Sequence, residues 1–230
     1  VHRALAMGVN YFDVAPAYGS TRAETVLGAA LVGIPRDRYV LSTKVGIRMS
    51  PVANDQGTGR KHLMAAVDEQ LKRLQTDYID VYQVHRLDPY TPMEETMYSL
   101  DQIVRSGKVR YIGGSTMPAY KFAQMVMIAD GKAYARPIAM QNLYNLVQRE
   151  EEREMNRLCD EQGVGLIPYS PLARGFLAGN RSKDGGGEEV HDISANFSEG
   201  LMGATRTSCM IMFILAGAAF LTKTMAFTGI

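Results

Sequence analysis

The sequence predicts an α/β protein with a parallel sheet, and three observations support this fold class. Six apolar, strand-like runs alternate with segments of helical periodicity, which is typical of parallel strands joined by right-handed crossovers. No GxGxxG fingerprint follows any run, which disfavours the doubly wound dinucleotide-binding fold. Candidate polar residues follow several different runs, as at the carboxyl face of a barrel. We therefore expect a (β/α)8 barrel of the TIM type, incomplete because six strands are clear, with the doubly wound sheet as the alternative.

The N-terminal segment indicates the end of a helix followed by the first strand. Residues 1–7 carry apolar side chains at helical spacing, and Gly8 is typical of the position just after a helix. We expect the natural chain to begin earlier, because no initiator Met is present. Residues 9–13 (VNYFD) predict a strand, and residues 24–32 predict the helix that follows it.

The next two strand–helix units have the clearest periodicity. Residues 39–43 (YVLST) predict a strand, and residues 62–74 predict a helix. One face of this helix carries its apolar residues: Leu63, Ala66, Val67, Leu71 and Leu74. Residues 78–84 (YIDVYQV) predict the third strand, and residues 93–104 predict a helix with an aligned apolar face.

The remaining units are shorter. Residues 109–113 predict a strand, and Pro118 suits the first turn of a helix that reaches about residue 129. Residues 138–141 predict the fifth strand. Residues 151–162 predict a charged helix that turns Met155, Leu158 and Cys159 inward, with the sixth strand at 164–168.

The composition is that of an ordinary globular protein, with 46% hydrophobic and 21% charged residues. We assign residues 1–230 to a single domain, with 197–230 as an atypical C-terminal tail. A net charge of +1 gives no electrostatic reason to expect nucleic acid as a partner. The two cysteines, Cys159 and Cys209, form no disulfide framework or metal motif, which favours a reducing compartment and predicts a cytoplasmic location.

The uncharged run at residues 207–222 is shorter than the roughly 20 residues that a membrane helix needs. We therefore expect a buried strand or helix there and no membrane partner. Association with a membrane is the alternative interpretation of this run.

Four polar residues that follow the first three strands form a candidate carbonyl-reducing site: Asp13, Tyr18, Lys44 and His85. A free phenol loses its proton only near pH ~10, and an adjacent ammonium stabilises the phenolate. Lys44 can supply that ammonium and Asp13 can pair with it, while His85 can hydrogen-bond a carbonyl oxygen. No side chain can give a hydride, so a cofactor has to supply it. Each residue alone suits packing or the surface, but the four together favour a site.

Several motifs resemble the aldo-keto reductase superfamily in order and spacing: NYFDVAPAYG, STKVG, YIDVYQVHRLDP, GKVRYIGGS, MQNLYNL and IPYSPLARGFLAG. The segment REEEREMNRLC resembles one bacterial and fungal branch of it. This resemblance extends from residue 1 to about residue 180. It implies a (β/α)8 barrel that binds NADPH or NADP+ without a Rossmann motif and reduces a small-molecule aldehyde or ketone. It also implies Tyr18 as the general acid, Lys44 and Asp13 as the residues that tune it, and His85 as the residue that orients the carbonyl.

The resemblance also implies the cofactor-binding positions, among which Asp13 is counted again. Ser115 and Gln141 match the residues that hold the nicotinamide carboxamide, and Tyr169 matches the aromatic residue on which the ring stacks. Thr116 stands where such families have Asn or Arg, a departure that would weaken this contact. The family's loop that lies along the pyrophosphate is matched by Ser170, Pro171, Leu172 and Arg174. Backbone amides and one cation are groups that suit a phosphate. No metal site is expected.

Two parts of the family pattern are not found in the sequence. One is a strand before residues 1–7. The other is the eighth strand with its helix, whose residues in the family bind the adenosine 2′-phosphate. We therefore expect a truncated chain. The missing C-terminal segment leaves the preference between NADP and NAD open. Unpaired edges of the sheet would favour self-association. Residues 209–215 offer a makeshift strand. The alternative function is a catalytically weak or inactive nucleotide-binding or regulatory protein, or a fragment.

Overall fold

A computed structural model of the protein describes residues 1–52 and 55–178. Within these residues the chain forms two compact units, residues 1–143 with 149–169 and residues 144–148 with 170–178, and each is described by itself. The predicted tail at 197–230, with its uncharged run at 207–222, lies outside the described residues. The assignment of the whole chain to one domain stays a prediction.

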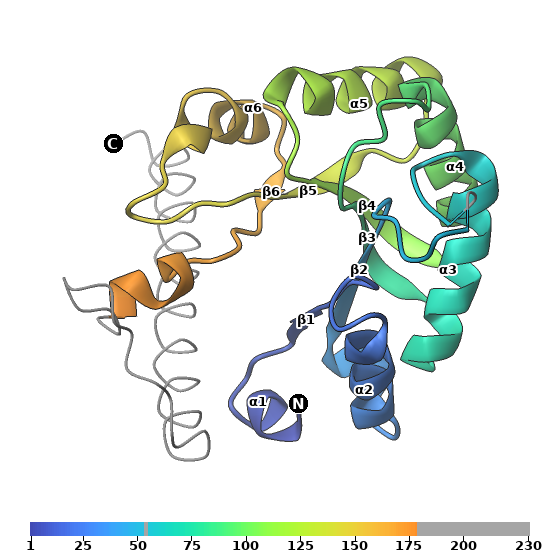
Figure 1. Cartoon of the computed structure of the whole chain (residues 1–230), viewed down its shortest axis with the longest axis vertical. Helices are drawn as coiled ribbons and strands as arrows, with labels where there is room; N and C mark the ends of the chain where they lie inside the picture. The colour runs from blue at the N-terminus through green and yellow to red at the C-terminus, as the bar shows by residue number, and fades with distance from the viewer. Residues whose placement is uncertain (53–54, 179–230) are drawn as a thin grey trace, which may run out of the picture. The chain divides into compact units, whose positions relative to one another are not determined.

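The first unit is built on one sheet of six parallel strands. They are β1 (Tyr11–Asp13), β2 (Val40–Val45), β3 (Ile79–Val84), β4 (Val109–Ser115), β5 (Pro137–Gln141) and β6 (Gly165–Leu166). Each strand pairs with the next one along the chain, so the spatial order equals the sequence order. A doubly wound sheet reverses its strand order at a switch point, whereas a barrel does not. The sheet also curls (Figure 1), and the prediction of an incomplete (β/α)8 barrel is confirmed.

Helices follow the strands, and α3, α4 and α5 lie along the convex side of the sheet (Figure 1). The helices of the first unit are α1 (His2–Ala6), α2 (Arg22–Leu31), α3 (Arg60–Leu74), α4 (Met93–Arg105), α5 (Ala119–Lys132) and α6 (Met155–Glu161). Two 3-10 turns, η1 (Arg36–Arg38) and η2 (Glu150–Glu152), complete this unit, and η3 (Ala173–Ala178) belongs to the second. No helix in the described part of the chain is long and apolar enough to cross a membrane.

The continuous helix predicted over residues 151–162 is wrong. Residues Glu150–Glu152 form the turn η2, and α6 begins only at Met155. Between them Glu154 has φ −136° and ψ −57°, which is outside the helical region. The Glu151 carboxylate accepts a 2.7 Å hydrogen bond from Asn142, on the loop after β5. This tertiary contact holds the turn in place, so it overrides the local helical preference of the charged segment.

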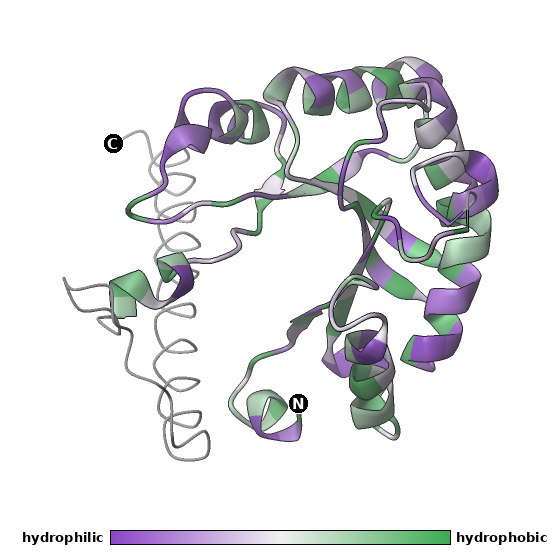
Figure 2. Ribbon diagram, viewed as in Figure 1, coloured by the Kyte–Doolittle hydropathy of each residue, from purple (hydrophilic) through white to green (hydrophobic). Residues whose placement is uncertain are grey.

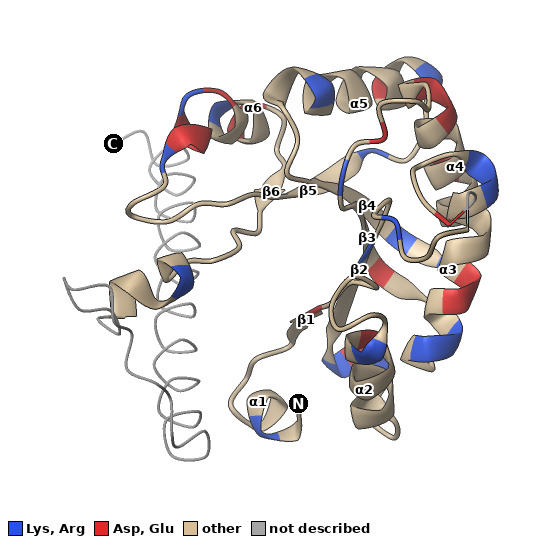
Figure 3. Cartoon of the chain, in the orientation of Figure 1, with Lys and Arg blue, Asp and Glu red and all other residues tan. Residues whose placement is uncertain are grey.

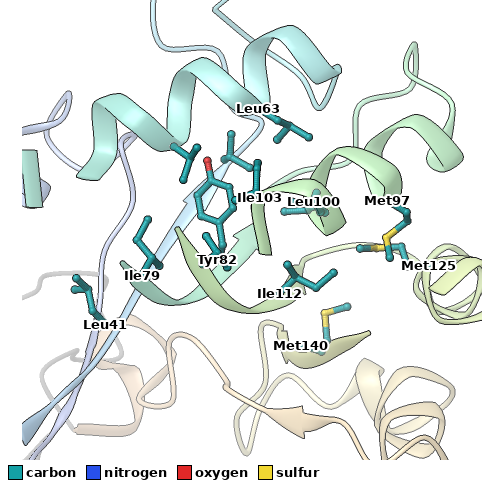
Figure 4. Packing of buried hydrophobic residues seen from close by; sticks show 14 of the residues in the cluster. Leu41, Leu63, Ile79, Tyr82, Met97, Leu100, Ile103, Ile112, Met125 and Met140 are labelled. Atoms are coloured by element: carbon teal, nitrogen blue, oxygen red, sulfur yellow. The ribbon is translucent and has the colours of Figure 1, made fainter. Parts of the chain in front are cut away.

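The hydrophobic core lies between the sheet and the helices. Ten of its fully buried members, labelled in Figure 4, come from β2 to β5 and from α3, α4 and α5: Leu41, Ile79, Tyr82, Ile112 and Met140, with Leu63, Met97, Leu100, Ile103 and Met125. Figure 2 shows the helices as mixed hydrophobic and hydrophilic ribbons, and Figure 3 places most charged residues on helices and loops. Burial of one such side chain stabilises the fold by about 1.5–3 kcal/mol. Cys159 joins this core as a buried free thiol, as expected.

Helices α2 and α3 touch backbone to backbone at Gly28. A β-carbon at position 28 would stand 2.5 Å from the carbonyl oxygen of Arg73 and 2.7 Å from the carbonyl carbon of Leu74. Backbone atoms cannot rotate away as the end of a long side chain can. The absence of a side chain at this position therefore sets how closely the two helices approach.

We predict that Gly28→Ala lowers the free energy of unfolding by about 1–3 kcal/mol, because the clash outweighs the gain in helix propensity. Gly131 is the matched control, since it lies in α5 and a β-carbon at that position would meet no other atom within 4 Å. Gly131→Ala should raise the free energy of unfolding by up to about 1 kcal/mol. Urea unfolding followed by circular dichroism measures both values, and equal stabilisation by the two changes would contradict the close packing.

Candidate active site

The candidate residues lie where the first three strands end, at the carboxyl edge of the sheet. Asp13 is the last residue of β1, Lys44 is the penultimate residue of β2, and His85 directly follows β3. In the sheet register Asp13 lies opposite Ser42, two residues before Lys44. Side chains two residues apart point to the same face of a sheet, so Asp13 and Lys44 share the inner face.

Lys44 is the central charge of this group. Its side chain is 0% exposed, and its ammonium forms an ion pair with the Oδ2 of Asp13 and donates a 3.0 Å hydrogen bond to the carbonyl oxygen of Val14. An unpaired ammonium at such a site would cost several kcal/mol of solvation free energy. The interpretation of Lys44 as a surface charge at a strand end is therefore wrong, and its burial makes the partners obligatory.

Tyr18 lies in the loop between β1 and α2, and its side chain is partly open to solvent, at 41% exposed. The Lys44 ammonium lies 4.9 Å from the centre of the Tyr18 ring. The three residues that follow, Gly19, Ser20 and Thr21, all have positive φ, which is costly for a β-branched residue. This left-handed turn reverses the chain into α2 and keeps the phenol at the edge of the sheet.

His85 faces the same phenol. Its ring meets that of Tyr18 edge to face, with centroids 5.9 Å apart and an interplanar angle of 90°. Burial is the main cause that lowers the pKa of His85 from 6.5 to about 4; the positive charges of Lys44 and Arg86 act in the same sense, and Asp13 opposes them. The imidazole is therefore neutral at neutral pH and can donate one hydrogen bond.

Three of the expected cofactor positions come together at the ends of β4 and β5. Ser115 and Gln141 are opposite each other in the register and are 2% and 5% exposed. The Ser115 hydroxyl donates a 3.0 Å hydrogen bond to the carbonyl oxygen of Gln141. Thr116, with φ 44°, donates its backbone N–H to that carbonyl at 3.1 Å and to the side chain of Asn142 at 3.2 Å.

The remaining expected cofactor positions follow β6. Tyr169 belongs to the first unit, where its backbone N–H donates to the carbonyl oxygen of Asn142 at 2.8 Å. Ser170 and the positions after it belong to the second unit: Ser170, Pro171, Leu172 and Arg174. In that unit Ser170 and Arg174 have left-handed φ values of 54° and 55°. The carbonyl oxygen of Ser170 accepts a 3.0 Å hydrogen bond from Asn145.

A polar network that the sequence analysis missed lies on the outer side of the sheet, where it contacts the backbone of β2 and not the side chains of the candidate site. The Gln70 amide donates to the carbonyl oxygen of Lys44 at 2.8 Å and to the Glu24 carboxylate at 2.9 Å. Arg73 also donates to Glu24, at 2.7 Å, and Tyr82 donates to the Gln70 oxygen at 2.6 Å. The sequence offered one signal for this network: Gln70 is a polar residue on the apolar face of the predicted helix, which indicates a buried amide that needs hydrogen-bond partners.

A cavity of about 450 Å³ borders Lys44 and His85. Pro16 of the β1–α2 loop, Ile47 after β2 and Ala66 of α3 form part of its wall. Its size lies within the range of small-molecule sites. Among the described residues, no group of three or more His, Cys, Asp or Glu side chains is arranged to hold a metal ion.

Comparison with known proteins agrees with this geometry. The family model for the aldo/keto reductase family matches residues 1–211. Three fungal relatives are an aldo-keto reductase of Metarhizium robertsii, the versiconal hemiacetal acetate reductase of Aspergillus parasiticus and an aldo-keto reductase of Alternaria alternata. They are 42%, 43% and 39% identical to this chain over 80%, 77% and 77% of its length.

The chain spans a little over half of the length of these relatives, at 56%, 57% and 55% respectively. The family match nevertheless covers most of the chain, including every strand of the sheet. This chain belongs to the aldo/keto reductase family.

Proposed function

We propose that this protein is an oxidoreductase that reduces an aldehyde or ketone to an alcohol with NADPH, and that Tyr18 is its general acid. The observation that carries the proposal is the buried Lys44 ammonium, which is paired with Asp13 and lies against the Tyr18 ring. Family membership and relatives named as reductases support the reaction type.

The side chains divide the work on the carbonyl group. The neutral His85 ring donates a hydrogen bond to the carbonyl oxygen and orients it between the ring and Tyr18. The Tyr18 hydroxyl then gives its proton to that oxygen, and the adjacent Lys44 charge stabilises the phenolate left behind. Asp13 holds the Lys44 side chain in place through their ion pair. NADPH, when bound, supplies the hydride that adds to the carbonyl carbon.

The residues present fit a nicotinamide cofactor. Ser115 and Gln141 offer a hydroxyl and an amide at neighbouring strand ends, which suits a carboxamide, and Thr116 stands beside them. Tyr169 offers a ring after β6 for stacking. For the second unit, taken by itself, we propose that the loop of Ser170, Pro171 and Leu172 and the Arg174 cation bind the pyrophosphate of the cofactor. Asp13 completes the set at the nicotinamide end.

The alternative is a protein that binds the nucleotide without turnover. Titration of the chain with NADPH, followed by the cofactor's own fluorescence, separates this alternative from the enzyme. Saturable binding together with NADPH oxidation in the presence of 4-nitrobenzaldehyde supports the reductase. Saturable binding without oxidation by any aldehyde offered supports the binding protein.

We predict that Tyr18→Phe lowers kcat with NADPH and 4-nitrobenzaldehyde by about 100-fold or more, because the proton donor is lost. Tyr98→Phe is the matched control, since Tyr98 is also 41% exposed but lies on α4, in the outer layer. The control should keep the wild-type rate. Equal rates for the wild type and Tyr18→Phe would rule out the phenol as the acid.

The lowered pKa of His85 predicts a pH dependence of stability. Between pH 6.5 and about 4 the unfolded chain takes up a proton at His85 that the folded chain does not. The free energy of unfolding should therefore fall as the pH is lowered through this window, and His85→Gln should fall less steeply than the wild type. Urea unfolding at pH 7, 6 and 5 measures both slopes; parallel slopes would show that His85 is not held neutral by the fold.

A further inference from the structure

Gln83 of β3 lies next to the Asp13–Lys44 pair inside the sheet. It is 0% exposed, and the register places it directly opposite Lys44. Its side-chain amide nitrogen donates to the Oδ1 of Asp13 at 3.2 Å and to the Oγ of Ser42 at 2.7 Å. Strands β1, β2 and β3 thus meet in one polar cluster, in which Ser42, Lys44 and Gln83 are buried.

The two oxygens of the Asp13 carboxylate are divided between two donors. Lys44 donates to Oδ2, and Gln83 donates to Oδ1. A carboxylate held at one oxygen alone can rotate about its own bond and share either oxygen with the ammonium. The Gln83 contact removes this freedom, so it sets the direction from which Asp13 holds the Lys44 ammonium.

The polar contacts of Gln83 differ from those of the other buried glutamine close to Lys44. Gln70 uses both ends of its amide, since its oxygen accepts from Tyr82 and its nitrogen donates to Glu24. The amide oxygen of Gln83 is buried and has no hydrogen-bond partner among the described residues. A buried acceptor without a partner costs about 1–3 kcal/mol. An apolar residue of similar size would avoid this cost, so stability alone does not account for an amide at this position.

The orientation of the amide follows from its neighbours. A carboxylate can only accept hydrogen bonds, so the nitrogen of Gln83 has to face Asp13. The opposite orientation would set the amide oxygen against a negatively charged oxygen of Asp13. The side-chain oxygen of Gln83 therefore lacks a partner within residues 1–52 and 55–178 because the side-chain nitrogen is turned toward Asp13.

We propose that Gln83 is a positioning residue for the reduction: its amide fixes the Asp13 carboxylate, and through it the Lys44 ammonium beside Tyr18. This inference rests on the proposed function and adds a residue to it. Gln83 touches neither the carbonyl nor the cofactor in this scheme. Its effect on the reaction passes entirely through Asp13.

The first experiment compares Gln83→Met with Gln70→Met, each of which removes a buried amide and keeps the volume. Gln83→Met alone should lower kcat, by about 10- to 100-fold, and change the pH profile of kcat with NADPH and 4-nitrobenzaldehyde. KM for the aldehyde should stay within about twofold, because Gln83 does not bind it. Gln70→Met should keep the wild-type pH profile.

A second variant, Gln83→Glu, keeps the shape but allows the group to ionise. While the introduced carboxyl is protonated it can still donate to Asp13, and once ionised it repels Asp13. Its kcat, relative to that of the wild type, should therefore fall as the pH rises, with a descending limb that Gln83→Met lacks. Because like charges raise the pKa of this carboxyl in the folded chain, its free energy of unfolding should also fall, relative to wild type, over the same pH range.

The outcomes separate the two proposals. A wild-type chain that oxidises no NADPH overturns the proposed function and the role of Gln83 with it. An active wild type whose Gln83→Met variant keeps kcat and pH profile overturns the role of Gln83 alone. A fall in kcat that Gln70→Met matches, with the same change in pH profile, also overturns it, because loss of packing would then explain both.

Discussion

The buried ammonium of Lys44 is the constraint on which the site depends. A fully buried cation is tolerated only when it is paired and hydrogen-bonded, and Lys44 meets this condition through Asp13 and the carbonyl oxygen of Val14. Both partners come from the end of β1, so the pair ties the first two strands together. The same pair holds a positive charge beside Tyr18, and that Lys44 charge adds to the burial that lowers the pKa of His85.

The alternation of side chains along β2 and β3 lets the same strands serve two purposes. Lys44 and Gln83 point inward to the site, whereas Thr43 and Tyr82, opposite each other in the register, point outward. There Thr43 donates to Glu24 of α2 at 2.7 Å, and Tyr82 donates to Gln70 of α3. The outer network thus anchors the helices on the strands that carry the site.

The loops at the strand ends position the groups of the candidate site that the strands do not carry. The left-handed residues after Tyr18 turn the chain sharply, and Asp88 connects the loop before α3 to the loop after β3. Burial acts to raise the pKa of Asp88, but hydrogen bonds from Thr91 and from the backbone N–H groups of Tyr90, Thr58 and Thr91 outweigh it and lower the pKa. The carboxylate therefore stays ionised, and it holds these loops together beside the ends of the strands that carry the candidate site.

The sequence by itself determined the order of strands and helices, because hydrophobic periodicity is a local property, and its motifs made Asp13, Tyr18, Lys44 and His85 the candidates for the site. The sequence did not predict the break in the helix before Met155, because a hydrogen bond from Asn142 decides the backbone geometry there. Only the tertiary structure showed that Lys44 is fully buried and that Gln83 and Gln70 flank it on opposite faces of the sheet. Register and burial depend on contacts between residues distant in the chain, and such contacts leave no periodic trace in a single sequence.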